Sequence, residues 1–389
     1  MNHIKLRELI RKVDGNKNKQ LKDLPLLGIN IDKEFMPSVA NTIGTDMSNY
    51  QIVKKEQFAC NPMHLGRDER MPTALLLDKD EILVSPAYFV FEIIDKNVLL
   101  PEYLMLYFKQ TETDRLLWFK TDSSVRGGLG WNELCDIEIP VPDLNIQKDI
   151  IRHYNQISDA IKIKEKLNNN LEQQAQAIFS NSFELNIDDN VNSIDKYIDV
   201  RDGTHDSPIA QKTGYPLITS KHLLPYGVNL SQANLISKAD FNKINKRSCV
   251  HTGDILLSMI GTVGNISLII EKEINFAVKN VALFKTSKIT SLIFYVLCYL
   301  KSKKINQLIE SKLLGSTQNY ISLTELRNLP FIIPSEEDLK LFNKTVAPIF
   351  KQVICNSNII FNLIYLRDTI FPKLMLENSD SSSDKLSFI

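Results

Sequence analysis

The chain has 389 residues, a hydrophobic content of 43% and a formal net charge of zero. This length exceeds what one compact core usually holds and predicts two domains, while the low Gly and Pro content excludes a fibrous or wholly disordered protein. A zero net charge argues against a uniformly basic nucleic-acid-binding protein. The charge is uneven, however, because residues 1–140 hold 18 Lys and Arg against 21 Asp and Glu, whereas residues 190–335 hold 17 against 10.

The five cysteines are scattered along the chain and form no Cys-x-x-Cys pair. This spacing argues against a disulfide framework or a zinc site and indicates a reducing compartment. The longest apolar run, residues 291–300, is about half the roughly 20 residues that a membrane helix needs. No basic and apolar leader opens the sequence. We therefore expect a cytoplasmic protein with no membrane partner.

Residues 1–142 consist of short segments rich in Val, Ile, Tyr and Phe, such as "YFVFEIID" at 88–95, separated by Gly, Pro, Asn and Asp. This composition is typical of strands and turns. A minor helix is predicted at 101–119. We expect a first domain of mixed α+β structure over residues 1–142.

Helical periodicity begins after Pro142, and Asp143 is the predicted N-cap of a long helix over residues 143–182. Its apolar residues recur at three- and four-residue steps, which places them on one face of the helix. They are Ile146, Ile150, Tyr154, Ile157, Ile161, Leu167, Leu171 and Ile178.

Residues 183–334 return to the pattern of strands and turns, as in "GDILLSMIG" at 253–261 and "VALFKT" at 281–286. A minor helix is predicted at 291–313. This second domain ends at Pro334, and a second long helix is expected over residues 335–376. Its apolar residues alternate in three- and four-residue steps, which is coiled-coil spacing. They are Leu339, Phe342, Val346, Ile349, Val353, Ile360, Leu363 and Ile370.

The second helix carries a start signal and a break signal. Ser335 with Asp338 forms a capping-box pattern at its beginning. Pro348 lies inside the periodic segment and should kink the helix or split off its first turns. The acidic and Ser-rich residues 377–389 are expected to be a disordered tail.

The two halves of the sequence repeat at an offset of 192 residues. Glu133 aligns with Glu325 and Pro142 with Pro334, and upstream "DEILVS" at 80–85 resembles "GDILLS" at 253–258. Two tandem units of about 190 residues explain this self-similarity. Each long helix is either an ordinary core helix of its domain or half of a pair. The apolar faces of the two predicted helices are equally long and lie one unit apart in the sequence. This favours an intramolecular antiparallel pair of helices.

Motifs that would carry chemistry are weak. "GTVGN" at 261–265 lacks the Lys of a phosphate-binding loop and is interpreted as a turn between strands. "NPMH" at 61–64 is similar to the Asn-Pro-Pro-aromatic strand end of amino-methyltransferases, but the second Pro and the aromatic residue are missing, so a turn with Asn61 exposed is preferred. His205 lies between Asp202 and Asp206, as in a base with its orienting acid or a metal site, yet no nucleophile or second ligand cluster accompanies it. A polar, ligand-contacting loop is the preferred interpretation of His205.

Polar and basic loop segments remain, and their residue types suit DNA. Arg and Lys bind guanine edges or phosphates, Asn and Gln read adenine, and Ser and Thr do either. A solvated surface loop is the alternative for any one segment. The predicted DNA-binding residues are Asn41, Lys54, Lys55, Asn61, His64, Arg67, Arg126, His205, Lys212, Lys221, Lys246, Arg247, Ser316, Thr317 and Gln318.

Several passages together resemble the specificity subunit of type I restriction-modification systems. They are "DKEFMPSVANTIGTDMS" (32–48), "FACNPMHLGRDE" (58–69), "SVRGGLGWNELCDIEIPVP" (124–142), "DGTHDSP" (202–208), "GDILLSMIGTVG" (253–264) and "GSTQNYIS" (315–322). The resemblance implies two tandem target-recognition domains, each reading one half of a bipartite asymmetric DNA site. It also implies that the two long spacer helices form an antiparallel coiled coil with pseudo-twofold symmetry. About 33 helical residues span roughly 50 Å, enough to hold two readers about a DNA turn apart.

The resemblance further implies that this chain has no catalytic residue, cofactor or metal. Two modification subunits would supply S-adenosylmethionine-dependent adenine methylation, and restriction subunits would supply translocation and cleavage with ATP and Mg. Double-stranded DNA and these subunits are the expected partners. Two alternatives stay open: a nucleic-acid methyltransferase with a degenerate motif, and a coiled-coil adaptor that does not bind DNA.

Overall fold

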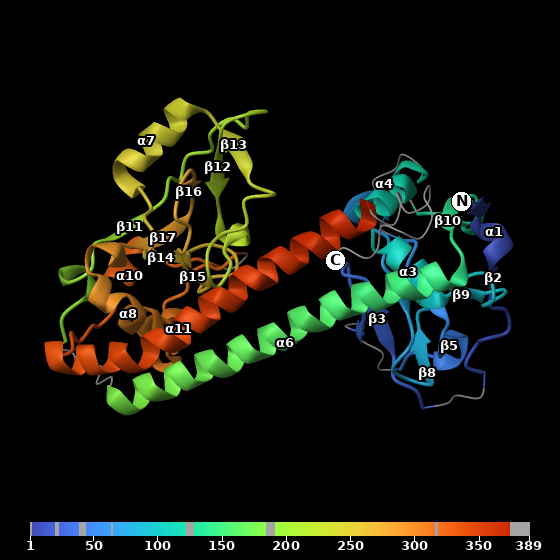
Figure 1. Ribbon diagram of the computed structural model, residues 1–389, viewed down its shortest axis with the longest axis horizontal. Coiled ribbons are helices and arrows are strands. Elements are labelled where there is room, and N and C mark those ends of the chain that lie inside the picture. The colour runs from blue at the N-terminus through green and yellow to red at the C-terminus, as the bar shows by residue number, and fades with distance from the viewer. Residues whose placement is uncertain are drawn as a thin grey trace. The chain divides into compact units, whose positions relative to one another are not determined.

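The computed structural model describes residues 2–19, 23–38, 44–63, 65–121, 128–183, 191–315 and 318–373 (Figure 1). The chain divides into two compact units, Met1–Ile161 with Asn362–Ile389 and Lys162–Phe361. These units divide the chain within both long helices, so they do not test the domain boundaries predicted at residues 142, 182, 334 and 376. The predicted disordered tail, residues 377–389, lies outside the described residues.

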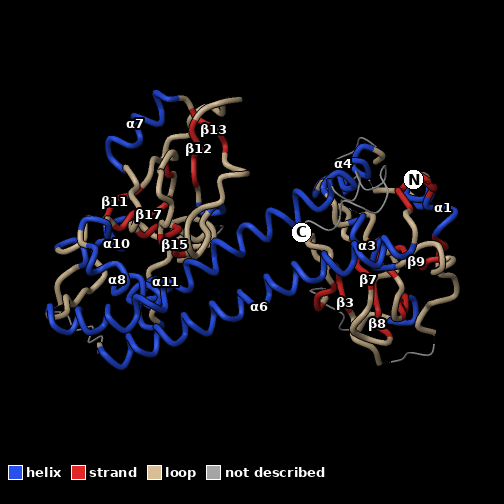
Figure 2. The backbone as a smooth tube through the Cα atoms, viewed as in Figure 1, coloured by secondary structure: helices blue, strands red, loops and turns tan. Residues whose placement is uncertain are grey.

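The first unit is built on a four-stranded antiparallel sheet with the order β2-β9-β6-β7. Its strands are Ile10–Lys12, Phe89–Ile93, Phe58–Cys60 and Thr73–Leu75. Figure 2 draws these strands in red and labels β7 and β9. The described residues of this unit also form three antiparallel strand pairs. They are β1 (Asn2–Lys5) with β10 (Glu138–Val141), β3 (Leu27–Ile29) with β4 (Phe35–Pro37), and β5 (Gln51–Lys54) with β8 (Glu81–Val84).

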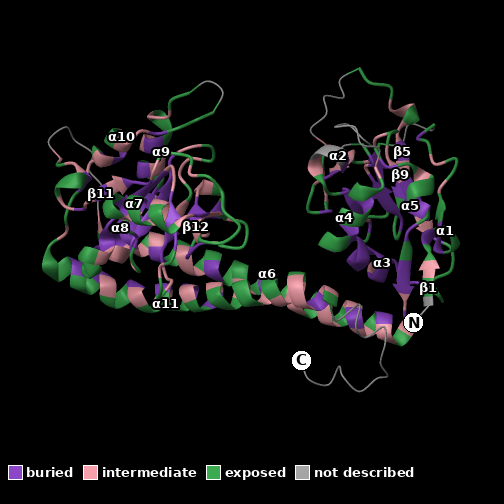
Figure 3. Cartoon of the chain, turned by 90° about the horizontal axis from the view of Figure 1, so that it is seen from above, coloured by how far each residue is buried: buried purple, intermediate pink, exposed green. Residues whose placement is uncertain are grey.

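Short helices of the first unit, within the part of the chain that the structure describes, are α1 (Leu6–Leu9), α2 (Leu65–Asp68), α3 (Pro101–Phe108), α4 (Thr111–Phe119) and α5 (Trp131–Cys135). The predicted helix at 101–119 is therefore two helices. The core lies where α3 meets the sheet, and there the rings of Phe58 and Phe91 stack with their centroids 4.9 Å apart. Figure 3 shows the buried residues of this unit gathered on the sheet and α3.

The second unit contains a four-stranded antiparallel sheet with the order β11-β17-β14-β15. Its strands are Val200–Asp202, Val281–Phe284, Ile255–Ser258 and Ile266–Leu268. A three-stranded sheet adds β13 (Asn234–Ile236), β12 (Tyr215–Ile218) and β16 (Ala277–Val278), with β16 parallel to β12. The short helices are α7 (Lys238–Ser248), α8 (Ile293–Lys301), α9 (Lys303–Ser311) and α10 (Leu323–Arg327).

The repeat detected in the sequence is present in the folds of the two units. Both have a four-stranded antiparallel sheet with the same chain-order pattern, and equivalent tyrosines make equivalent hydrogen bonds. The hydroxyl of Tyr103 donates to the Pro140 carbonyl at 3.1 Å, and the hydroxyl of Tyr295 donates to the Ile332 carbonyl at 2.7 Å. Donors and acceptors are each one repeat apart along the chain. Residues 192 positions apart in the sequence therefore occupy equivalent places in the two folds, where α3 and α8 contact the last residues of their domains.

One predicted correspondence between the repeats is wrong. The stretch "GDILLS" supplies β14, which lies in the four-stranded sheet between β17 and β15, whereas "DEILVS" supplies β8, which pairs with β5 in a separate two-stranded sheet. The structural equivalent of β14 in the first unit is β6, because β6 lies between β9 and β7. Two segments with similar apolar sequences thus form strands that pair with different neighbours. Strand pairing depends on contacts between residues that are distant in sequence.

Both predicted long helices are present as α6 (Leu144–Ser182) and α11 (Glu336–Tyr365) (Figure 1). The capping pair also forms, because the Asp338 amide donates to the Ser335 hydroxyl at 3.1 Å. α11 continues through Pro348 as one helix, so its first turns are not split off there, while a kink at Pro348 stays a prediction. An irregular turn, a π-helix, follows α11 at Leu366–Ile370. A Pro inside a helix removes one hydrogen bond, and the burial of neighbouring Val346 and Phe350 in the core offsets that loss.

The two helices pair antiparallel within each unit. In the second unit the Lys164 ammonium lies 3.1 Å from the Asn356 amide oxygen, and the Asn168 amide donates to the Val353 carbonyl at 3.3 Å. In the first unit the rings of Tyr154 and Phe371 meet edge to face with centroids 5.6 Å apart. The α+β class with tandem domains and long paired helices is confirmed.

By length and composition alone, the helical segment Glu336–Lys373 would be long and apolar enough to cross a membrane. Core helices of soluble proteins pass the same test. Five apolar side chains of this segment are part of the core of the second unit: Leu339, Phe342, Val346, Phe350 and Val353.

Candidate nucleic-acid interface

A cluster of polar side chains lies at the end of β11 in the second unit, around the buried carboxylate of Asp202. The Oδ2 atom of Asp202 lies 2.8 Å from Nε2 of His205, and its Oδ1 atom accepts a hydrogen bond from Nη2 of Arg247, at the end of α7. The other ring nitrogen of His205, Nδ1, lies 2.8 Å from the Asn280 amide oxygen. Three segments distant in sequence thus meet around one carboxylate.

The backbone around Gly203 sets this geometry. Its amide donates to the Val281 carbonyl at 2.9 Å, and the Thr204 amide donates to the Val278 carbonyl at 3.0 Å. A Cβ atom added at Gly203 would lie 2.3 Å from the Val278 carbonyl oxygen, so only glycine fits this close approach. The turn that faces it contains Asn280 with φ of 54°, a conformation that Asn tolerates better than most residues.

Arg201, next to Asp202 on β11, holds the end of α7. Its Nη1 donates to the Arg247 carbonyl at 2.7 Å, while Nε and Nη2 bond to the carboxylate of Asp199. These bonds from Arg201, with a further one from Lys288, lower the pKa of Asp199 to about 2 despite its partial burial. The main chain and the side chain of Arg247 are therefore both anchored to consecutive residues of one strand.

Further cations surround this cluster on the surface. The Lys279 ammonium donates to the Ser207 hydroxyl at 2.6 Å, and Lys243 of α7 lies 3.2 Å from the Asp206 carboxylate. Lys246 is exposed on the same helix. Exposed ion pairs of this kind hold side chains loosely. Their cations can exchange a carboxylate for a phosphate.

The first unit has a comparable anchor in a buried ion pair. The Lys33 ammonium lies 2.6 Å from Oδ1 of Asp114, which also accepts a hydrogen bond from the Met71 amide at 3.1 Å. Lys33 adopts a left-handed φ of 65° in the turn between β3 and β4, and burial lowers its pKa although Asp114 opposes that shift. The pair joins this turn to α4 and to Met71, which follows the predicted DNA-binding residues Asn61 and Arg67 in the chain.

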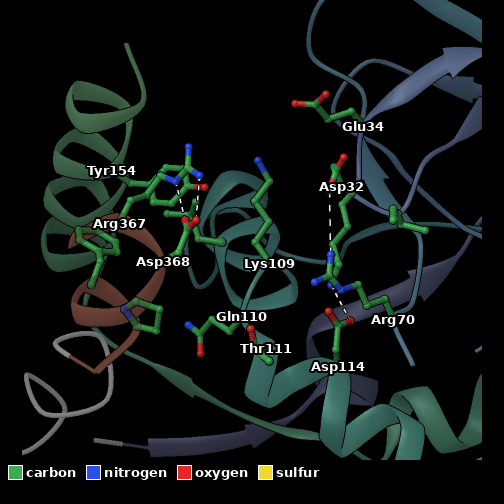
Figure 4. A pocket seen from close by; sticks show the side chains of 15 residues that line it. Asp32, Glu34, Arg70, Lys109, Gln110, Thr111, Asp114, Tyr154, Arg367 and Asp368 are labelled. Carbon is green, nitrogen blue, oxygen red and sulfur yellow. Dashed lines mark hydrogen bonds and ion pairs between the residues drawn. The ribbon is translucent and has the colours of Figure 1, made fainter. Parts of the chain in front are cut away.

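A pocket of about 340 Å³ lies beside this ion pair in the first unit (Figure 4). The Lys109 ammonium lies 5.7 Å from the centre of the Tyr154 ring, and Arg367 bonds to Asp368 at 2.6 Å. Four cationic and four carboxylate side chains line this pocket. The lining has no excess positive charge, so we assign no DNA contact to it.

The two weak motifs both lie in hairpin loops. The described residues of "NPMH", 61–63, follow β6 and precede β7, while residues 261–265, "GTVGN", connect β14 to β15 as predicted. The amide oxygen of Asn61 accepts from the Met63 amide at 3.1 Å, which closes a local turn. The predicted turn is therefore present, but Asn61 is half-buried, so its predicted exposure is wrong.

The structure brings together only some of the predicted DNA-binding residues. His205 and Arg247 meet at Asp202, and Lys246 lies on the same helix as Arg247. Gln318 is exposed beside the β14–β15 hairpin, where the Gly261 amide donates to the Asn319 carbonyl at 3.1 Å. The remaining described lysines of the set are exposed elsewhere on the two units: Lys54, Lys55, Lys212 and Lys221.

Several predicted contacts lie outside the described residues: Asn41, His64, Arg126, Ser316 and Thr317. Arg67 belongs to α2, but its side chain is likewise outside the description. Lys279 and Asn280 were missed by sequence reasoning. Their one signal is a polar pair between two apolar runs, which indicates a turn but not its partner. Contact with DNA stays a prediction for every residue of the set.

Within the described residues, no three His, Cys, Asp or Glu side chains form a group that could hold a metal ion. What the site offers is a set of anchored and exposed polar side chains on antiparallel sheets. Together with the sheet order that both units share, the fold defines a class of protein with two related mixed α+β domains in one chain.

The comparisons with known proteins identify the family. Residues 16–173 and 199–363 match the type I restriction modification DNA specificity domain, and the chain belongs to this family. Its role is therefore DNA recognition. The specificity subunit of the type I restriction enzyme MjaIX from Methanocaldococcus jannaschii is 24% identical over 311 residues, which cover 73% of this chain and 70% of that protein.

Two further proteins are similar to this chain. The specificity subunit of the HindI enzyme from Haemophilus influenzae is 30% identical over 110 residues, or 27% of this chain and 23% of that protein. A solved type I restriction-modification S subunit from M. genitalium covers 96% of this chain and 95% of its own, with a TM-score of 0.49 and 14% identity.

Proposed function

We propose that this chain reads a bipartite asymmetric DNA sequence, with one unit for each half-site. The observation that carries the proposal is the double match to a DNA specificity domain over units that share one sheet order but differ in their added strands. A shared sheet presents loops in equivalent places, and different loops read different bases. The asymmetry of the site then follows from the differences between the two units.

We further propose that the chain is not an enzyme. The methylation chemistry would belong to modification subunits that bind S-adenosylmethionine, and translocation and cleavage would belong to restriction subunits that use ATP and Mg. Two repeated units favour two modification subunits, one for each copy. The five cysteines are all free, which suits a reducing cytoplasm where chromosomal DNA is accessible.

Base-resolution methylation mapping of the host tests the proposal. One bipartite motif with a fixed gap should lose its methylation when this chain is deleted and regain it when the chain is restored. An unchanged methylation pattern after deletion contradicts the proposal.

A binding experiment separates the alternatives. The purified chain alone should not bind S-adenosylmethionine, whereas its complex with the modification subunit should bind duplex DNA that carries the motif. Tight binding of S-adenosylmethionine by the chain alone would favour a methyltransferase. A complex that binds no DNA would favour a protein-only adaptor.

A further inference from the structure

We propose that Arg247 reads a guanine in the second half-site and that Asp202 is the positioning residue that fixes Arg247 for this contact. The inference rests on the proposed function, since it assumes that the second unit reads one half-site. It identifies a specific base reader among the basic residues of this unit, and it assigns a role to a buried carboxylate that contacts no base itself.

The first observation is the way one carboxylate is shared. The side chain of Asp202 is 5% exposed, and its two oxygens bind His205 and Arg247 separately. The side chains of those two residues are 59% and 62% exposed. Arg247 therefore has one terminal nitrogen held from inside the domain while most of its side chain is open to solvent. Both ring nitrogens of His205, by contrast, already have partners, Asp202 and Asn280. A buried carboxylate with basic groups on both oxygens keeps both groups in one orientation.

The second observation is that Arg247 is also held through its main chain. Its carbonyl oxygen accepts the hydrogen bond from Arg201, and β11, which carries Arg201 and Asp202, pairs with β17 of the central sheet. An arginine on a surface helix normally samples many rotamers. Here the backbone and one terminal nitrogen are both attached to the same strand, so little freedom remains to be lost on binding.

The chemistry of the Arg247 guanidinium favours a contact with a base over a contact with a phosphate. The guanidinium is planar, and its N–H groups match the O6 and N7 acceptors of guanine, which lie side by side in the major groove. A phosphate contact draws its strength from net positive charge and tolerates a flexible ammonium. Asp202 neutralises the positive charge of Arg247 and fixes the direction of its guanidinium. This arrangement weakens attraction to a phosphate but favours a directed pair of hydrogen bonds to a base. Lys243 and Lys246 on the same helix are better suited by chemistry to phosphates.

The test uses the complete complex with its modification subunit and a set of duplexes in which each base pair of the second half-site is varied in turn. Arg247→Ala should abolish discrimination at one G·C pair, a change of about 5- to 150-fold in relative methylation rate at that position. Arg247→Lys should fail to restore it, because lysine lacks the planar fork. Asp202→Asn should weaken discrimination at the same base pair, because an amide loses the charge that orients Arg247.

Lys246→Ala is the matched control, since it removes the same charge from the neighbouring position of α7 and measures the loss due to charge alone. Unaltered discrimination at the first half-site shows that each variant complex is folded. If Asp202→Asn fails to fold, the two variants of exposed Arg247 still decide the question.

A uniform loss over all duplexes in Arg247→Ala that Arg247→Lys restores would assign Arg247 to a phosphate and overturn the inference. Unchanged discrimination in both variants would reduce the Asp202–Arg247 pair to a structural contact and would also overturn it. If the wild-type complex recognised no second half-site, the proposed function itself would fail, which is a different result.

Discussion

At the scale of single residues, buried carboxylates organise segments that are far apart in the sequence. Asp114 joins Lys33 to the Met71 amide in the first unit, and Asp202 joins His205 to Arg247 in the second. Removing one partner of a buried ion pair leaves an uncompensated charge, which costs far more than the loss of an exposed pair. The stability of the loops at these anchors is therefore sensitive to single substitutions.

Asp114→Asn should destabilise the first unit by about 3–5 kcal/mol near neutral pH, because Lys33 loses its partner while remaining buried. Its effect should also depend on pH. Burial already lowers the pKa of Lys33 below the ordinary 10.5, and loss of Asp114 lowers it further. Between the folded and unfolded pKa values the unfolded chain binds more protons, so the stability of Asp114→Asn should rise with pH in that window.

Urea unfolding over a pH series from neutral to alkaline checks this prediction. Both tryptophans, Trp118 and Trp131, belong to the first unit, so their fluorescence reports on that unit. The control is a Lys33→Met/Asp114→Asn double variant, which has no lysine to titrate at this position and should show no such rise. Equal pH dependence of the single and double variants would contradict the prediction.

Cysteine reactivity should follow burial. Desolvation raises the pKa of Cys60 and of Cys298 to about 12, whereas Cys249 and Cys355 are exposed. A thiol reacts as its thiolate, so a chromogenic disulfide at a pH of about 8 should label Cys249 and Cys355 rapidly in the native chain and the buried cysteines only after denaturation. Mass mapping of the labelled peptides measures this order. Early labelling of Cys298 would show that the second core opens locally.

At the scale of elements, the pairing of α6 with α11 combines apolar packing with a buried polar contact. The Asn356 amide donates to the Asn168 amide oxygen at 2.9 Å, and Asn356 is fully buried. Lys164, one repeat before Asn356, reaches the same side chain. A polar pair in an apolar seam fixes which residues face each other, at a cost in stability.

Asn356→Leu should destabilise the second unit by about 1–3 kcal/mol, because the amide oxygen of Asn168 stays buried without its donor. The double variant Asn168→Leu/Asn356→Leu should recover most of that loss, since two apolar side chains replace the matched pair. Calorimetric unfolding of the single and double variants measures the coupling. A double variant less stable than either single variant would show that the amides contribute net stability.

At the scale of the whole molecule, the balance of charge differs between the repeats. Residues 1–140 are slightly acidic, and residues 190–335 carry an excess of seven positive charges. The phosphate backbone supplies much of the affinity of DNA-binding proteins through released counterions. The second unit should therefore contribute more of the salt-dependent binding than the first.

Replacing Lys212 and Lys221 with Gln should reduce the salt dependence of DNA binding by the complex, and the slope should change by about 1 for each phosphate that is no longer neutralised. The matched variant replaces Lys54 and Lys55, which are exposed in the first unit, and should change the slope less. Binding measured at several salt concentrations gives both slopes. A larger change for the Lys54 and Lys55 variant would reverse the assignment of charge to the units.

The features that follow from local patterns were determined by the sequence alone. The spacing of apolar residues predicted both α6 and α11, Ser335 and Asp338 predicted the start of α11, and the 192-residue offset predicted two related domains. These signals depend on neighbours within a few turns or on self-similarity over a whole unit, and tertiary contacts left these particular features in place.

Only the tertiary structure decided which strands pair and which distant side chains meet. Residues 80–85 and 253–258 are similar in sequence, but the strands that they form pair with different strands. α11 continues through Pro348 because the side chains next to it are packed in the core. The sequence places Asp202 near His205, but the hydrogen bond from Arg247 to Asp202 joins residues 45 positions apart, and no local pattern predicts it. Long-range contacts are selected by packing of the entire domain, and a periodicity along the chain carries no information about that choice.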